Sequence, residues 1–367
     1  MPLELADGED HLPEFIELPY RLHKNTPWVP ELKAETRALL SPGHPFAENG
    51  ELKLFIALRD GVCAGRIAAV VNRLHNTFHN DRCGFFGFFE CENNPETAGM
   101  LIGAVKEFLG TRGLGAMRGP MNPSTNHTCG MLCEGYDLPP VIMMPWNPSY
   151  YHELMASCGL EKVKDVVSFI RYTKQDMSPR LEKILARIDR KPNIKIRPFD
   201  ISRLDKEMSL MREIYNDAWS ENWGFIPLSR RDVEADAKSL KPILKGEHGT
   251  IVEVNGVPAG VGLVIPDINQ ALAKTRGSLT PLNLLPFLWQ LKHITFSRLI
   301  TLGVKKEYRM LGLDLLLVRE AIRTAAKLGW DGGDLGWVLE DNVKMINIIE
   351  EVGGRLYKRF RIYQCPL

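Results

Sequence analysis

The stretch VKKEYRMLGLDLLLVREAI, residues 304–322, decides how the second half of this chain folds. The residues just before it, Leu299–Val304, form an apolar and β-branched run, and apolar residues recur at helical spacing after Gly312. The sequence therefore predicts a strand, a turn at Gly312 and a helix over Leu313–Leu328. The first turn of such a helix presents backbone N–H groups, and the helix dipole adds about half a positive charge there. A turn of this kind suits an anion.

The side chains around the turn strengthen this prediction, with one exception. Gly312 has no Cβ, which allows an anion to approach the backbone closely. Arg309, and secondarily Lys305 and Lys306, supply charge-assisted contacts. The exception is Asp314, an acid in the first helical turn. It either caps the helix or weakens anion binding, and we expect the first, with its carboxylate directed away from the N–H groups.

Composition limits the class of protein. The chain has 367 residues, enough for two domains, with 44% hydrophobic and 25% charged residues, as in soluble globular proteins. A formal net charge of +1 gives no electrostatic case for nucleic acid as a partner. Seven scattered cysteines, with no signal peptide in the sequence, lead us to expect reduced thiols and a cytoplasmic protein. We expect no transmembrane segment, because no window of about 18 residues is uninterruptedly apolar.

The order of predicted elements repeats. The first half reads as a helix, a hairpin of two strands, a third strand at 83–91, a helix at 95–113, a short strand, a helix and a closing strand. The second half shows the same order, with a hairpin turn at Asn255–Gly256. The charged, proline-containing stretch 174–193 lies between the halves. We therefore expect two domains, 1–185 and 186–367, of one α/β (α+β) architecture, each a mixed, mostly antiparallel sheet flanked by helices.

The second half resembles an acyl-CoA N-acyltransferase domain of the GNAT superfamily, over about residues 195–367. That superfamily carries Q/R-x-x-G-x-G/A between a strand and a helix, and residues 309–314 read R-x-x-G-x-D here. The resemblance implies acetyl-CoA or a longer acyl-CoA as co-substrate. It places the cofactor contacts at a set of residues spread over the fourth strand, the turn and the next helix: Leu302, Val304, Arg309, Leu311, Gly312, Leu313, Asp314 and Asn342. The first half resembles a diverged copy that lacks the motif, because CENNPETAGMLIG stands in its place.

The pair of halves also resembles a group of bacterial double-GNAT proteins, through NDAWSENWGFIPLS (216–229) and GPMNPSTNHTCGMLCEGYDLPPVIMMPWNPSYY (119–151). Together these features imply an acyl-CoA-dependent N-acyltransferase that passes its acyl group directly to an unidentified amine in a ternary complex. Some members resemble long-chain acyltransferases of bacterial sphingolipid synthesis, so transfer to a lipid amine is one alternative. A coenzyme A-binding regulatory protein without turnover is another.

The resemblance also bears on catalytic groups. The superfamily's tyrosine on the last helix, which protonates the leaving thiolate, corresponds to Ile349 here. Tyr357 and Tyr363 on the last strand are the substitutes, although both also suit half-buried strand positions. Glu340 is a candidate base, with helix capping as its alternative role.

Two segments are expected to bind the acceptor. In the first, aromatic side chains form an apolar wall and polar neighbours bind an amine or hydroxyl; these residues are Trp219, Glu221, Asn222, Trp223 and Phe225. In the second, the loop that follows residue 119, we expect Asn122 and Asn126 to contact the acceptor. The alternatives are a packed aromatic core for the first segment and a self-satisfying, turn-rich loop for the second.

The apolar insertion at 279–296, broken by Pro281 and Pro286, forms either a channel for an acceptor or acyl chain or a contact with a membrane surface. A packed lid or a homodimer contact is the alternative. We expect no metal site, because the one Cys-x3-Cys pair, Cys129 and Cys133, has no second pair to complete four ligands.

Overall fold

The computed structural model describes residues 2–367, which cluster into two compact units. Unit 1 contains the chain through Val166, Asn269–Lys292 and Lys358–Leu367, and unit 2 contains Val167–Ile268 and His293–Tyr357. Strands β9 (Glu161–Tyr172) and β15 (Arg355–Pro366) each begin in one unit and end in the other. The units therefore exchange short pieces of chain, where the sequence led us to expect a single division at residue 185.

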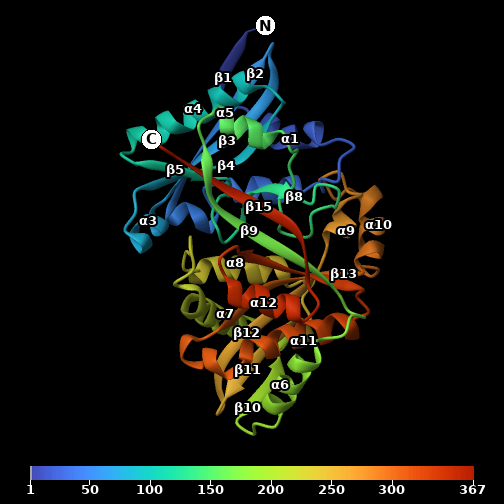
Figure 1. The fold of residues 1–367 in the computed structure, drawn as a ribbon. Helices are drawn as coiled ribbons and strands as arrows, with labels where there is room; N and C mark the ends of the chain where they lie inside the picture. Colours follow the sequence, from blue (N-terminus) through green and yellow to red (C-terminus); the bar gives the residue numbers. More distant parts are fainter. Residues whose placement is uncertain (1) are drawn as a thin grey trace. The chain divides into compact units, whose positions relative to one another are not determined.

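The stretch that we expected to link the halves belongs to unit 2. It forms helix α6 (Pro179–Asp189), with Ser178 as N-cap and a proline in the first turn. Leu181, Leu185 and Ile188 pack into the core of unit 2 with the leucines of the helix that follows Gly312. Figure 1 shows α6 beside that helix, α11. The polar face of α6 accounts for the misleading composition.

Unit 2 contains an antiparallel meander followed by one parallel strand. The pairs β10–β11, β11–β12 and β12–β13 are antiparallel, and β13–β14 is parallel. Asn255 and Gly256, both with positive φ, form the predicted hairpin turn. The strands are β10 (Ile194–Pro198), β11 (Gly249–Val254), β12 (Val257–Pro266), β13 (Phe296–Val304) and β14 (Gly332–Leu339).

Glycines show which helix covers which face of this sheet. A Cβ on Gly260 or Gly262 would meet Leu317 of α11, whereas a Cβ on Gly303 would meet Ala218 of α7. Helices α11 and α7 therefore pack on opposite faces of β12 and β13. The helices of unit 2 besides α6 are α7 (Leu204–Trp219), α8 (Arg230–Leu240), α11 (Leu313–Lys327) and α12 (Val343–Glu351).

Unit 1 repeats this order. Strands β1 to β4 form an antiparallel meander, β4 pairs with β5 in parallel, and the end of β15 pairs with β5. The strands are β1 (Leu3–Asp7), β2 (Gly50–Arg59), β3 (Val62–Asn72), β4 (Cys83–Cys91) and β5 (Ala116–Gly119), with the shorter β6 (Met121–Asn122), β7 (Thr128–Cys129) and β8 (Met131–Glu134). The helices are α1 (Leu12–Leu22), α2 (Lys33–Leu39), α3 (Arg73–His79), α4 (Pro95–Thr111), α5 (Tyr151–Ser157), α9 (Asn269–Leu272) and α10 (Pro281–Leu291).

Three general features follow from the described residues. No helix within 2–367 has the length and apolarity to cross a bilayer. Across the same residues, no group of three or more His, Cys, Asp or Glu side chains is arranged to hold a metal ion. The seven cysteines are free thiols.

Candidate active site

The central feature of unit 2 is an opening between β13 and β14. Their parallel pairing runs from Phe296–Gly332 to Leu299–Leu335 and stops there, although β13 continues to Val304 and β14 to Leu339. The separation coincides with a bulge, because Leu299 pairs with Val264 and Thr301 with Leu263, which leaves Ile300 as an extra residue in β13. The bulge therefore lies just before Leu302 and Val304, two of the cofactor contacts that the resemblance implies.

The opening receives backbone groups from β13. Lys305 donates its N–H to the carbonyl of Ala259 in β12 (2.8 Å). Since successive residues of a strand direct their N–H and C=O groups to opposite sides, Val304 and Leu302 direct theirs away from β12. Consistent with this, the Leu302 carbonyl accepts a hydrogen bond from the indole Nε1 of Trp219 (3.0 Å). The N–H groups of Leu302 and Val304 are therefore placed as donors for a carbonyl oxygen in the opening.

The loop after β13 brings together two segments that the sequence singled out separately. It forms a short 3-10 helix, Lys306–Leu311, and then α11, with Gly312 in the left-handed region (φ 76°). Lys306 donates its backbone N–H to Asp217 in α7 (2.7 Å), and Arg309 donates to the carbonyl of Ala218 (2.6 Å). The motif loop and the end of α7 thus lie side by side.

An exposed carboxylate balances the cations of this loop. Glu221 Oε1 lies 3.0 Å from Lys306 Nζ, and Glu221 Oε2 lies 3.5 Å from Arg309 Nη1. The hydrogen bond from Lys306 holds the pKa of Glu221 below its usual range. Glu221 therefore neutralises the cations that the motif would offer to an anion, which differs from the expected role as an amine ligand.

Asp314 caps α11, but its carboxylate does not point away from the N–H groups. Its Oδ1 accepts the N–H of Leu315 (3.0 Å), and its Oδ2 pairs with Lys344 Nζ of α12 (2.6 Å). The side chain therefore uses one of the first-turn donors, and Lys344 balances its charge. The capping role that we expected agrees with this geometry, whereas the expected orientation is wrong.

Gly312 is required for packing as well as for its backbone conformation. Its φ of 76° is costly for other L-residues, and an added Cβ would lie 2.9 Å from Ile188 Cδ1 of α6. A substitution at Gly312 would therefore disturb the contact of α6 with α11 in addition to any ligand.

Tyr357 is part of a buried polar cluster in unit 2. Its hydroxyl donates to Asp334 Oδ2 (2.8 Å), Ser168 donates to the same carboxylate, and Arg298 Nε lies 3.4 Å from Asp334 Oδ1. Burial and then Asp334 raise the pKa of Tyr357 well above its ordinary value. The cluster lies where β13 and β14 are still paired, since Arg298 and Asp334 are partners in that pairing. Of its four residues, only Tyr357 was predicted from the sequence.

The remaining predicted residues of unit 2 have separate roles. Asn342 is the N-cap of α12 and accepts the N–H of Met345 (3.2 Å). Glu340 is half-buried directly after β14. The aromatic wall is partly core, since Phe225 is buried and packs near Tyr215, which stacks on Trp219 with ring centroids 4.8 Å apart. Asn222 and Trp223 are half-buried in the loop between them.

Tyr363 belongs to unit 1, whereas the residues of the motif, 309–314, belong to unit 2. It hydrogen-bonds through its hydroxyl with His152 Nδ1 (2.5 Å), and burial raises the pKa of Tyr363 to about 12. The opposite ring nitrogen of His152 bonds to the Leu132 carbonyl (2.8 Å) and the Tyr136 hydroxyl (2.9 Å). The two substitutes that we expected for the missing tyrosine therefore lie in different hydrogen-bond networks.

In unit 1, the counterpart of the opening is filled by the chain itself. The N–H of Phe88, at the bulge of β4, is accepted by Asn122 Oδ1 (2.6 Å), and a Cβ on Gly87 would lie 1.9 Å from the Met121 carbonyl oxygen. Asn122 also donates to Thr128 (3.1 Å). Its carboxamide is thus committed within unit 1, where we expected an acceptor ligand.

A second donor of β4 is also occupied. Glu92 donates its N–H to Ala64 of β3 (3.0 Å), as Lys305 does to Ala259 in unit 2, so Cys91 corresponds to Val304. The Cys91 N–H is accepted by the Tyr151 hydroxyl (3.0 Å), and the Cys91 carbonyl accepts from Tyr150 (2.8 Å). The signature ending in SYY therefore closes the edge of β4 that unit 2 leaves open on β13.

Tyr151 connects this edge to buried charges. Its hydroxyl donates to Glu90 Oε2 (2.7 Å), which also lies 2.6 Å from His23 Nε2 of α1. Burial acts to raise the pKa of Glu90, but His23 and Arg66 outweigh it and the net shift is downward. The nearby loop holds Asn126, which donates its N–H to Ser124 Oγ (3.2 Å). The sequence analysis missed His23 and Glu90, because neither lies in a recognisable motif.

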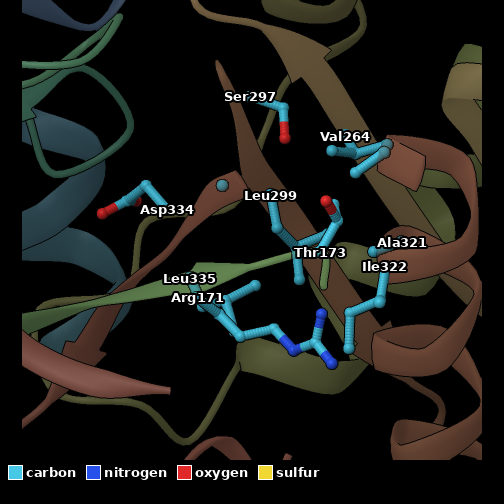
Figure 2. A pocket seen from close by; sticks show the side chains of 11 residues that line it. Arg171, Thr173, Val264, Ser297, Leu299, Ala321, Ile322, Asp334 and Leu335 are labelled. Carbon is cyan, nitrogen blue, oxygen red and sulfur yellow. The ribbon is translucent and has the colours of Figure 1, made fainter. Parts of the chain in front are cut away.

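A small, mostly apolar pocket lies at the other end of the unit 2 strands. Ala321 and Ile322 of α11 line one side and Asp334 lies on the other (Figure 2). Its strand residues, including Ser297, Leu299 and Leu335, come from the beginnings of β13 and β14. The pocket is therefore distinct from the opening near Leu302 and Val304.

Comparisons with known proteins place this geometry in context. No family model matches the chain. The "Bacterial ceramide synthase" of Caulobacter vibrioides is 34% identical over 368 residues, which covers 97% of this chain and 95% of that protein. "Protein YghO" of Escherichia coli is 30% identical over 365 residues, which covers 97% and 93%.

Solved structures agree on the fold. A tandem GNAT protein from the clavulanic acid biosynthesis pathway superposes with a TM-score of 0.59 at 12% identity, covering 100% of this chain and 98% of that one. A GCN5-related N-acetyltransferase from Sphaerobacter thermophilus gives a TM-score of 0.51 at 13% identity, covering 85% and 80%. The expected tandem GNAT fold is confirmed.

Proposed function

The chain belongs to the family of the bacterial ceramide synthase of Caulobacter vibrioides and protein YghO of Escherichia coli and has the tandem GNAT fold, and on this premise we propose that it transfers a long acyl chain from coenzyme A to the amine of a lipid base. The sequence left open whether the acceptor is a small amine or a lipid amine, and we propose the lipid amine. The name of the Caulobacter relative supports it, since a ceramide is an N-acylated lipid base.

The observation that carries the acyl-transfer assignment is the open edge of β13. Two N–H groups, those of Leu302 and Val304, are directed away from β12 where β13 has left β14. Donors fixed on a strand stabilise the negative charge that develops on a thioester oxygen when an amine attacks. The new C–N bond forms as the C–S bond breaks, and the proton of the amine passes to the leaving thiolate.

The residues near the opening also suit coenzyme A. Lys306, Arg309 and the first turn of α11 offer cations and a helix N-terminus for its phosphates. Glu221 forms ion pairs with both Lys306 and Arg309. The phosphates would therefore have to displace an exposed carboxylate. Such a displacement costs little, because solvent and salt screen an exposed ion pair.

The test is a product assay on the full chain. Purified protein is incubated with palmitoyl-CoA or acetyl-CoA and, in turn, a sphingoid base and a short water-soluble amine, and products are identified by mass spectrometry. The proposal predicts an N-palmitoylated sphingoid base. Acetylation of the short amine alone would contradict the lipid assignment, and release of free coenzyme A with no amide from any amine would contradict the transfer.

A further inference from the structure

Helix α10 leaves its apolar side chains largely exposed. It spans Pro281–Leu291, and all of its eleven residues except Asn283 and Gln290 are Leu, Pro, Phe or Trp, yet none is buried. We propose that α10 is a docking element that inserts its outer face into an anionic lipid surface.

The most exposed residues of α10 share one face. Leu282 is 92% exposed, Leu285 74% and Trp289 59%. Positions i, i+3 and i+7 lie on the same side of a helix. An apolar face that includes a tryptophan is the arrangement by which a helix lies in the plane of a membrane interface.

The segment just before the helix is held on unit 1, and Asn283 ties the first turn of the helix to that segment. Asn283 donates to the carbonyls of Ser278 (2.7 Å) and Thr275 (3.2 Å). The Gly277 carbonyl accepts the N–H of Lys33 (2.9 Å), and Asn269 donates to the Pro140 carbonyl (2.9 Å). Helix α10 is therefore an anchored surface element of unit 1.

The charges around α10 complement an anionic surface. No acidic residue occurs between Asp267 and Glu307, a stretch that contains the whole of α10. Lys274 and Arg276 precede the helix and Lys292 follows it, and all three are exposed. Basic residues that flank an apolar face attract phosphate headgroups and add to the binding of the face itself.

A second copy of the chain fits this face less well than a bilayer. A helix of eleven residues is roughly 16 Å long and about 10 Å wide, so one face covers on the order of 160 Å². A stable protein interface needs about 800 Å² per partner. A lipid surface has no such minimum, because each side chain partitions separately.

The test uses the full chain and vesicles of phosphatidylglycerol and phosphatidylcholine. We expect the chain to sediment with these vesicles, and Leu282→Glu/Leu285→Glu to lower the partition coefficient roughly tenfold or more. The matched control is Val62→Glu/Leu138→Glu, which places two acids on exposed apolar positions of unit 1 and should bind like the unaltered chain. Melting temperatures check that all three proteins are folded.

Three results would overturn this inference: no sedimentation of the unaltered chain, equal sedimentation of the α10 variant, or equal loss in the control. Light scattering tests whether a second copy of the chain covers this face. If the unaltered chain is a dimer and the α10 variant is a monomer, the face is an interface between two chains. The inference does not depend on the proposed acyl transfer, because binding is measured without substrates.

Discussion

The indole N–H of Trp219 donates a 3.0 Å hydrogen bond to the carbonyl of Leu302, on the part of β13 that has separated from β14. The bond joins the end of α7 to the strand that we assign to the thioester. It therefore orients a stretch of backbone that pairs with β12 on one side and is not paired with β14 on the other.

Replacing this donor should misalign the strand. Trp219→Phe keeps the ring against Tyr215 but leaves the Leu302 carbonyl without its indole partner, and we expect kcat/KM for acyl transfer to fall roughly tenfold because small displacements of catalytic donors are costly. Steady-state kinetics measure the effect, with Trp28→Phe in unit 1 as control. An equal loss in both variants would remove the special role of Trp219.

The N–H of Leu302 itself can be deleted. Leu302→Pro removes the donor without breaking a bond to β12, because that N–H is directed away from β12. Leu302→Ala keeps the N–H and removes most of the side chain. We expect kcat to fall about 100-fold in the proline variant and far less in the alanine variant. Similar kcat values in the two folded variants would show that the N–H is not used.

Glu221 should oppose the binding of coenzyme A. Glu221→Gln releases Lys306 and Arg309 from a negative charge, so we expect the Kd for coenzyme A to fall severalfold, about the worth of one exposed ion pair. Calorimetry measures the Kd. Glu234→Gln is the control, because Glu234 pairs with Arg230 (2.7 Å) within α8 and not with a cation near the turn. Weaker binding of coenzyme A by Glu221→Gln would contradict the assignment of Lys306 and Arg309 to its phosphates.

The ionisation of Asp165 should make the stability of the fold depend on pH. Its Oδ1 and Oδ2 accept from Arg361 at 3.0 and 3.1 Å. Burial acts to raise the pKa of Asp165, but Arg361 and Lys162 outweigh it and hold the pKa below 3.8. A lowered folded-state pKa gives stability that is complete above the unfolded-state pKa and is lost as pH falls through the folded-state value.

Asp165→Asn should therefore lower the free energy of unfolding by about 3 kcal/mol at pH 7, since it leaves a partly buried arginine without its anion. The difference should begin to narrow below about pH 4, where the carboxylate of the unfolded chain protonates first, and should narrow further as pH falls through the lowered native pKa of Asp165. Urea unfolding of both proteins at pH 7 and below pH 4 measures this difference in the free energy of unfolding. Glu161→Gln, on the same strand but exposed, should have little effect at either pH, and a pH-independent deficit in Asp165→Asn would contradict the linkage.

Local signals predicted most of the fold. Three elements could be predicted because each depends on residues that are neighbours in the sequence. They are the Asn255–Gly256 turn, the strand before Gly312 and the helix after it. Strand β1 and helix α3 were missed, since five and seven residues give little periodicity. Helix α6 was missed because its polar face dominates its composition, and only its packing on α11 explains its apolar residues.

The site was less predictable, because its roles depend on contacts between distant segments. The motif located the turn, but the pairing of Glu221 with Lys306 joins residues 85 positions apart. Tyr357 was a candidate acid from the sequence, but its hydroxyl donates its hydrogen bond to Asp334. Likewise, the closure of β4 by Asn122 and Tyr151 requires the tertiary structure.

The central claim is that unit 2 holds the acyl-CoA and that unit 1, whose corresponding edge is closed, does not. Hydrogen–deuterium exchange of the full chain, with and without palmitoyl-CoA, tests it most directly. The account predicts that the ligand slows exchange in peptides that cover 300–316 and leaves 86–92 unchanged. Slower exchange at 86–92 with no change at 300–316 would contradict it.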